Sequence, residues 1–156
     1  ARIQEGTAVA LKETNFLGLK ISGVLVVKKG AKVSARNELR VSNAGQVKLQ
    51  GGMIESQRWL EIKKGGVLKG YGMIKGNLYN QGTLALQMDK PLQVDGSVNL
   101  SGSLELLKTG TINNAESYTV LQANSIAGGF VNDEVSIGGK RFSVFYTPTS
   151  VTVKAK

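Results

Sequence analysis

Residues 42–106 nearly repeat themselves at an interval of 20 residues. Gly52-Met53-Ile54 returns as Gly72-Met73-Ile74, and Gly82-Thr83-Leu84 returns as Gly102-Ser103-Leu104. A fixed period of this length is typical of repeat architectures, in which each repeat is one structural unit that stacks on the next. The period therefore favours a solenoid over a fold built around a single closed core.

The alternation of apolar and polar residues identifies the repeating unit as β structure. Leu60-Glu61-Ile62 and Leu104-Glu105-Leu106 have a period of two, which is typical of strands with one buried face. A leucine-rich repeat would carry a leucine-asparagine signature, which is absent, and a β-sandwich would not produce identities at a fixed offset. The sequence therefore predicts an all-β chain folded as a parallel β-helix, with coils of about 20 residues and a C-terminal β cap.

The offset identities also predict which side chains stack in the parallel β-helix. Residues one period apart are expected to lie on neighbouring strands in parallel register. The predicted stacks are Met53 over Met73, Ile54 over Ile74 over Val94, and Leu84 over Leu104.

Three segments are expected within one structural domain. Residues 1–24 lack the repeat and are interpreted as an atypical N-terminal coil that covers one end of the stack. Residues 25–106 form the β-solenoid repeats. Residues 107–156 break the repeat but contain well-alternating strands, with Phe130, Phe142 and Tyr146 as bulky residues, and are interpreted as the C-terminal cap.

Composition excludes several kinds of chemistry. The chain of 156 residues contains no cysteine and no histidine, so the usual catalytic triads and most zinc sites cannot be assembled. No apolar run reaches the length of a membrane span, which is about 18 residues or more. Because the sequence starts at Ala1, we expect a processed product or a segment of a larger protein.

The positive charge is concentrated in the first half of the chain. Residues 1–75 contain 14 Lys and Arg against 5 Asp and Glu, which equals the whole net charge of +9. Residues 76–156 are neutral. Such asymmetry indicates an anionic partner, with solubility alone as the alternative explanation.

Basic and aromatic residues of this half define a candidate binding surface. At a spacing of one period Trp59 falls beside Tyr79, and Trp59 points outward if Leu60 points inward. At the same spacing Lys28 falls over Lys48, where two ammonium groups repel each other unless solvent or an anion screens them. Alternatively, Trp59 packs over a corner of the coil or under a loop. The candidate carbohydrate-binding residues are Lys28, Lys48, Arg58, Trp59, Lys63, Lys64 and Tyr79.

Residues 70–84 fit the pattern G-x-G-x-I-x-G-x-x-x-N-x-G-x-L. This segment resembles the β-helical passenger domains of bacterial autotransporters and related secreted β-solenoid proteins, and the likeness extends over residues 65–153. The resemblance implies a right-handed coil and an extracellular or cell-surface location in a bacterium. It does not distinguish adhesin stalks from modules of polysaccharide-acting proteins. One segment departs from the family, because residues 85–91 replace a P-G-x-S-like loop.

Two functions from different classes are consistent with these features. The first is a non-catalytic module that binds an acidic or sulfated polysaccharide, since Lys and Arg pair with carboxylate and sulfate groups. The second is a structural stalk or folding-nucleus segment of an autotransporter-type adhesin with no ligand of its own. An enzyme is not expected, because the carboxylates are scattered, and no cofactor or metal is expected. Nucleic acid is not expected as a partner, because the aromatic residues are too few for base stacking.

Overall fold

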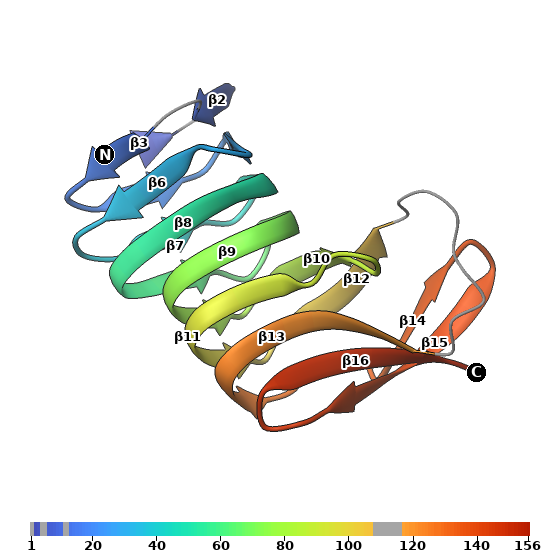
Figure 1. Cartoon of the computed structure of the whole chain (residues 1–156). Helices are drawn as coiled ribbons and strands as arrows, with labels where there is room; N and C mark the ends of the chain where they lie inside the picture. Colours follow the sequence, from blue (N-terminus) through green and yellow to red (C-terminus); the bar gives the residue numbers. More distant parts are fainter. Residues whose placement is uncertain (1, 4–5, 11–12, 108–116) are drawn as a thin grey trace.

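The computed structural model describes residues 2–3, 6–10, 13–107 and 117–156, and these residues form sixteen strands and no helix. The coils stack along one axis, with the two termini at opposite ends (Figure 1). The all-β solenoid predicted from the repeat is thus confirmed. The strands are β1 (Arg2–Ile3), β2 (Thr7–Ala10), β3 (Glu13–Phe16), β4 (Leu19–Ile21), β5 (Val24–Lys28), β6 (Lys32–Ala35), β7 (Leu39–Val41), β8 (Gln46–Ile62), β9 (Val67–Asn80), β10 (Thr83–Gln87), β11 (Leu92–Leu100), β12 (Ser103–Leu107), β13 (Ser117–Gly128), β14 (Glu134–Ile137), β15 (Lys140–Tyr146) and β16 (Ser150–Ala155).

Each coil has three faces, as the long strand β8 shows. Its successive parts pair in parallel with three separate strands of the preceding coil, namely β5, β6 and β7. The chain therefore turns two corners within β8. The first face contains β2, β5, residues 46–50 and 67–70, β10 and β12. The second face contains β3, β6 and residues 53–56, 73–75, 92–95 and 121–123. The third face contains β1, β4, β7 and residues 59–62, 77–80, 97–100 and 125–128.

The core lies between the three faces and consists of ladders of aliphatic side chains. Val33, Ile54, Ile74 and Val94 form one ladder on the second face, and each is at most 4% exposed. Burial of a side chain of this size stabilises a fold by about 1.5–3 kcal/mol, so the stacked coils share one continuous hydrophobic core. All the stacks predicted from the offset identities are present in parallel register, including Leu84 over Leu104.

The coils differ in length on the first face. Val47 pairs with Leu25 of the preceding coil and with Leu68 of the following coil, and Leu68 in turn pairs with Leu84. The residue numbers show that the chain between Leu25 and Val47 is longer than the chain between Leu68 and Leu84. The period seen in the sequence is therefore an average, and the differences arise at the corners.

Close packing of the coils explains why one corner requires glycine. Gly70 has a φ of 114°, and a Cβ atom at this position would lie 1.9 Å from the carbonyl oxygen of Leu49 in the preceding coil. Only glycine adopts such a φ without strain while allowing this approach.

The last parallel strand, β13, joins the solenoid to the C-terminal cap. It pairs in parallel with β11 on one side and antiparallel with β16 on the other. Antiparallel pairing then continues from β16 to β15 and β14, at the end of the molecule that carries the C-terminus (Figure 1). Phe130 and Phe142 belong to the buried core cluster, whereas Tyr146 is exposed and its hydroxyl accepts a hydrogen bond from the Phe130 amide.

The N-terminal segment stacks on the solenoid in the same way as later coils. Strands β1, β2 and β3 pair in parallel with β4, β5 and β6, respectively. Its strands thus extend all three faces.

Candidate functional site

The predicted site residues lie at several places around the coil rather than on one surface. Lys48 is on the first face, and Lys28 ends β5 at the corner between the first and second faces. Lys63 and Lys64 follow β8 at the corner between the third and first faces. The remaining three residues lie on or beside the third face and are Arg58, Trp59 and Tyr79.

The predicted pairing of Lys28 with Lys48 is wrong. Lys28 pairs with Gln50 and Gly51, and the strand partner of Lys48 in the preceding coil is Val26. This coil is longer than the repeat period, so the register is displaced by two positions. Lys48 instead pairs with Lys69 of the following coil, which places two ammonium groups on the first face.

The structure does bring the predicted aromatic residues together. The rings of Trp59 and Tyr79 meet edge to face, with centroids 6.4 Å apart, and the Arg58 guanidinium lies 6.0 Å from the centroid of the Trp59 ring. Tyr79 is 42% exposed, and Trp59 is partly exposed. Edge-to-face aromatic contacts and cation–π contacts both stabilise such a cluster. An aromatic surface flanked by a cation is the kind of surface on which a sugar ring can pack.

A ladder of charged side chains leads along the third face to this aromatic cluster. The register pairs Arg2 with Lys20, Lys20 with Arg40, Arg40 with Glu61, and Glu61 with Tyr79. Neighbouring strands lie about 4.8 Å apart, so the three cations are spaced evenly along the solenoid axis. Sequence reasoning missed Arg2, Lys20 and Arg40 as site residues, because their common face depends on the register of coils that lack the clear repeat.

Glu61 holds two of the surrounding cations in place. Its carboxylate lies 2.5 Å from the Lys63 ammonium and 3.7 Å from the Arg40 Nε atom. The Glu61 side chain is only 14% exposed, so these ion pairs are better shielded from solvent than pairs on an open surface. Glu61 therefore lowers the positive potential at the end of the ladder that adjoins Tyr79, while it orders Arg40 and Lys63.

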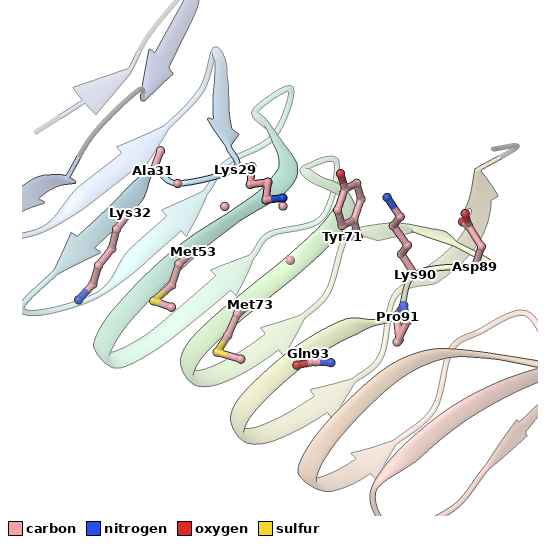
Figure 2. A pocket seen from close by; sticks show the side chains of 14 residues that line it. Lys29, Ala31, Lys32, Met53, Tyr71, Met73, Asp89, Lys90, Pro91 and Gln93 are labelled. Atoms are coloured by element: carbon pink, nitrogen blue, oxygen red, sulfur yellow. The ribbon is translucent and has the colours of Figure 1, made fainter. Parts of the chain in front are cut away.

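A separate groove lies at the corner between the first and second faces, and it has a volume of about 670 Å³. None of the candidate residues from the sequence lines it. Figure 2 shows its two rows of side chains, with Met53, Met73 and Gln93 on the second face and Tyr71 beside Lys90 at the corner. Sequence reasoning missed this groove because it is created by the corners, whose shape the repeat pattern does not define.

One of the lysines that line this groove takes part in an ion pair. Lys32 Nζ lies 2.6 Å from Glu55 Oε2. The hydrogen bond between them raises the pKa of Lys32 and lowers the pKa of Glu55, while desolvation opposes both shifts. Lys32 is thus already paired with a carboxylate, and it contributes less to anion binding than an unpaired lysine would.

Neither a metal centre nor a membrane-spanning helix is found within the described residues. Residues 2–3, 6–10, 13–107 and 117–156 contain no group of three acidic side chains arranged to hold a metal ion. The same ranges contain no helix with the length and hydropathy needed to cross a bilayer.

A scan against protein-family models finds no match, and searches of curated proteins and of solved structures find none either. The likeness to autotransporter passenger domains is therefore a prediction from the sequence, and the architecture established by the structure is the β-solenoid with its C-terminal cap.

Proposed function

We propose that this chain is a non-catalytic module that binds a linear acidic or sulfated polysaccharide along the third face of the solenoid. One observation carries the proposal. The ladder of Arg2, Lys20 and Arg40 runs parallel to the solenoid axis toward Tyr79, which contacts Trp59. A linear polymer that lies along this axis would contact the cations with one part of its length and the aromatic rings with the next part.

The chemistry of the ladder fits a polymer of acidic sugars. Arg2 and Lys20 can each pair with a carboxylate or sulfate group, and arginine can do so through two parallel hydrogen bonds. Arg40 is already paired with Glu61, so it contributes less than an unpaired cation would. Exposed ion pairs contribute only about 0.2–1 kcal/mol each, so useful affinity requires several along one polymer. The aromatic pair adds a contact that does not depend on charge, because the apolar side of a sugar ring packs against an aromatic surface.

The proposal also includes the kind of protein to which the module belongs and its location. On the strength of the sequence resemblance, we place it in a larger secreted protein, in the extracellular space or at the surface of a bacterium. The alternative function is a structural stalk or folding-nucleus segment of an adhesin, which the continuous stacking of coils also supports. The two functions differ in whether the isolated chain binds any acidic polysaccharide.

The proposal is tested by affinity electrophoresis in gels that contain polygalacturonate, dextran sulfate or neutral dextran. We expect the two acidic polymers to retard the protein at low salt and less at high salt, whereas neutral dextran has little effect. The double variant Lys20→Gln/Arg40→Gln should weaken retardation several-fold. Its matched control is Lys48→Gln/Lys69→Gln, which removes the same charge from the first face.

The outcomes separate the hypotheses. Loss of retardation in the Lys20/Arg40 variant alone supports the third face as the site. Equal loss in both double variants means that net charge rather than the ladder determines binding, and it contradicts the proposed site. No retardation of the wild-type protein by either acidic polymer at low salt contradicts polysaccharide binding and favours the stalk.

A further inference from the structure

We propose that the groove between the first and second faces is a second binding site, whose ligand is a single-chain anionic amphiphile. Such a ligand has one apolar chain and one carboxylate, sulfate or phosphate group. The groove is separate from the third face, so this site is independent of the polysaccharide-binding proposal.

One wall of the groove is apolar at positions where the neighbouring coils carry polar residues. Register places Met53 and Met73 between Lys32 and Gln93 in a single outward-facing ladder. Ile54 and Ile74 point into the core, so the methionines beside them face outward, and both are partly exposed. Methionine is flexible and polarisable, and it is common on surfaces that accept apolar ligands of variable shape.

The opposite wall combines an aromatic ring with two exposed lysines. Lys29 and Lys90 lie on either side of Tyr71 (Figure 2), and the Lys90 ammonium is 4.5 Å from the centroid of the Tyr71 ring. A ligand chain lying between Tyr71 and the methionines would therefore have its charged end within reach of one of these lysines.

A glycine at the corner leaves space within the wall that contains Tyr71. Gly51 lies between Lys29 and Tyr71, and a Cβ atom on it would be 3.4 Å from Lys29 Cβ and 3.3 Å from Tyr71 Cε2. A larger side chain at this position would therefore occupy the space between Lys29 and Tyr71 within this wall. The φ of Gly51 is 85°, which favours glycine, so the same residue shapes the corner and separates Lys29 from Tyr71.

The charges around the groove favour an anion. Its lining contains Lys29, Lys32 and Lys90, and Asp89 is the only carboxylate among the described lining residues. Lys32 is paired with Glu55, so Lys29 and Lys90 are the lysines that we expect to contact the ligand.

The dimensions fit a chain rather than a compact anion. Residues of four successive coils line the groove, and three steps of about 4.8 Å give a length of about 14 Å. The volume of about 670 Å³ lies within the range of about 300–1,000 Å³ that is usual for small-molecule sites. An elongated apolar chain uses this length, whereas a simple inorganic anion would leave the methionine wall uncovered.

The three methionines of the chain provide a direct test. Met53 and Met73 line the groove, and Met88 is buried in the core, so it serves as an internal reference. In the full chain with labelled methionine methyl groups, NMR titration with laurate below its micelle-forming concentration should shift the Met53 and Met73 signals saturably. The Met88 signal should stay in place.

Two further ligands separate the contributions of the chain and of the charge. Dodecyl maltoside has an alkyl chain of nearly the same length without the anion, and we expect it to bind about tenfold more weakly than laurate. Acetate has the anion without the chain and should give no saturable shift. No shift with laurate, equal shifts of all three methionines, or equal affinity for dodecyl maltoside would each overturn the proposal.

Other sources of the same chemistry are excluded by two more experiments. Trigalacturonate, an acidic sugar fragment, should leave the Met53 and Met73 signals unchanged, and a laurate-like response would assign the groove to polysaccharide instead. Binding to vesicles of anionic phospholipid without binding to laurate monomers would assign it to membranes. Either result would contradict a site for a free amphiphile.

Variants test the walls of the groove. Lys29→Gln/Lys90→Gln should weaken laurate binding several-fold, whereas Lys64→Gln, at an exposed position outside the groove, should not. Met73→Gln should weaken laurate binding about tenfold through loss of apolar contact, with folding verified by the unchanged Met88 signal. Wild-type affinity in both groove variants would contradict the site.

Discussion

The rings of Trp59 and Tyr79 touch edge to face on the third face, although their backbones are not paired. The strand partner of Trp59 is Asn77, and the partner of Tyr79 is Glu61, so the two aromatic residues are diagonal neighbours on adjacent coils. Large side chains reach such diagonal positions. Tyr79 is 42% exposed and Arg58 lies beside the Trp59 ring, so replacement of Trp59 is a specific test of binding.

Replacement of Trp59 by Ala should weaken binding to polygalacturonate even at high salt. Packing of a ring against a sugar does not rely on charge, whereas the contribution of the cations is screened as salt rises. We expect a loss of about tenfold, on the scale of one aromatic contact, in affinity electrophoresis at both salt concentrations. Trp59→Phe, which retains an aromatic ring, should recover part of the affinity. Equal retardation of Trp59→Ala and wild type at high salt would remove Trp59 from the site.

Much of the solenoid could be predicted because stacking repeats the same environment. Ile54 and Ile74 occupy equivalent inward positions in successive coils, and selection for a similar side chain leaves a visible repeat at a fixed offset. The alternation of apolar and polar residues around Leu60 likewise predicted correctly which side chains of the third face point into the core. Local pattern and tertiary environment agree at these positions, so the sequence was sufficient to identify them.

The register of the first coils and the groove could not be predicted because corners vary without a strong pattern. On the first face, the coil that separates Leu25 from Val47 is longer than the coil that separates Leu68 from Leu84. A longer coil displaces the register between that coil and the next one. For this reason Lys28 does not pair with Lys48. A corner is defined by backbone conformation at a few glycines, and the repeat pattern carries no information about the space that remains outside it.

Asn80→Leu should stabilise the protein. Asn80 is 1% exposed at an inward position between Ile62 and Leu100, and neither polar atom of its side-chain amide has a hydrogen-bond partner. A buried polar group without a partner costs about 1–3 kcal/mol, and leucine has a similar branched shape without that cost. Urea unfolding should show an increase of about 1–2 kcal/mol in the free energy of unfolding. The exposed control Asn99→Leu should change it little, and destabilisation by Asn80→Leu would contradict this prediction.

The ion pair of Lys32 and Glu55 should contribute to stability only in a defined pH range. The pKa of Glu55 is lowered from 4.5 in the folded chain, because it accepts a hydrogen bond from Lys32. Its contribution is therefore present above pH 4.5 and is lost as the pH falls through the lowered value. The pKa of Lys32 is raised from 10.5, so its contribution is present below pH 10.5 and is lost as the pH rises through the raised value.

Thermal unfolding of Glu55→Gln across the pH range measures this contribution. The variant should melt slightly below the wild type at neutral pH, and the difference should vanish in acid, where wild-type Glu55 becomes protonated. Both side chains are partly exposed to solvent, so the difference is expected to be small. Glu105→Gln serves as a control at an exposed carboxylate elsewhere on the solenoid. A difference between Glu55→Gln and wild type that persists unchanged into acid would exclude the ion pair as its cause.

Phe142 and Phe145 provide a matched test of the C-terminal cap, because both lie on β15. Phe142 is 1% exposed and contacts Tyr118 edge to face, with centroids 6.3 Å apart, whereas Phe145 is 47% exposed with the Lys154 ammonium 4.9 Å from its ring centroid. Removal of a buried Phe side chain costs about 3–5 kcal/mol, because transfer energy is lost and a cavity remains. An exposed cation–π contact is worth about 0.5–1 kcal/mol.

Phe142→Ala should therefore lower the free energy of unfolding by about 3–5 kcal/mol, and Phe145→Ala by less than about 1 kcal/mol. The larger effect follows from the position of Phe142, since Val135, Val144 and Val153 belong to the same buried cluster as the solenoid core. Loosening the cap would also uncover the antiparallel edge of β13, which is a template for pairing with another chain. Light scattering during urea unfolding should accordingly show aggregation of Phe142→Ala before its solenoid unfolds. Equal stability of the two variants, or a soluble monomeric Phe142→Ala with wild-type stability, would show that these residues are not needed to close this end of the stack.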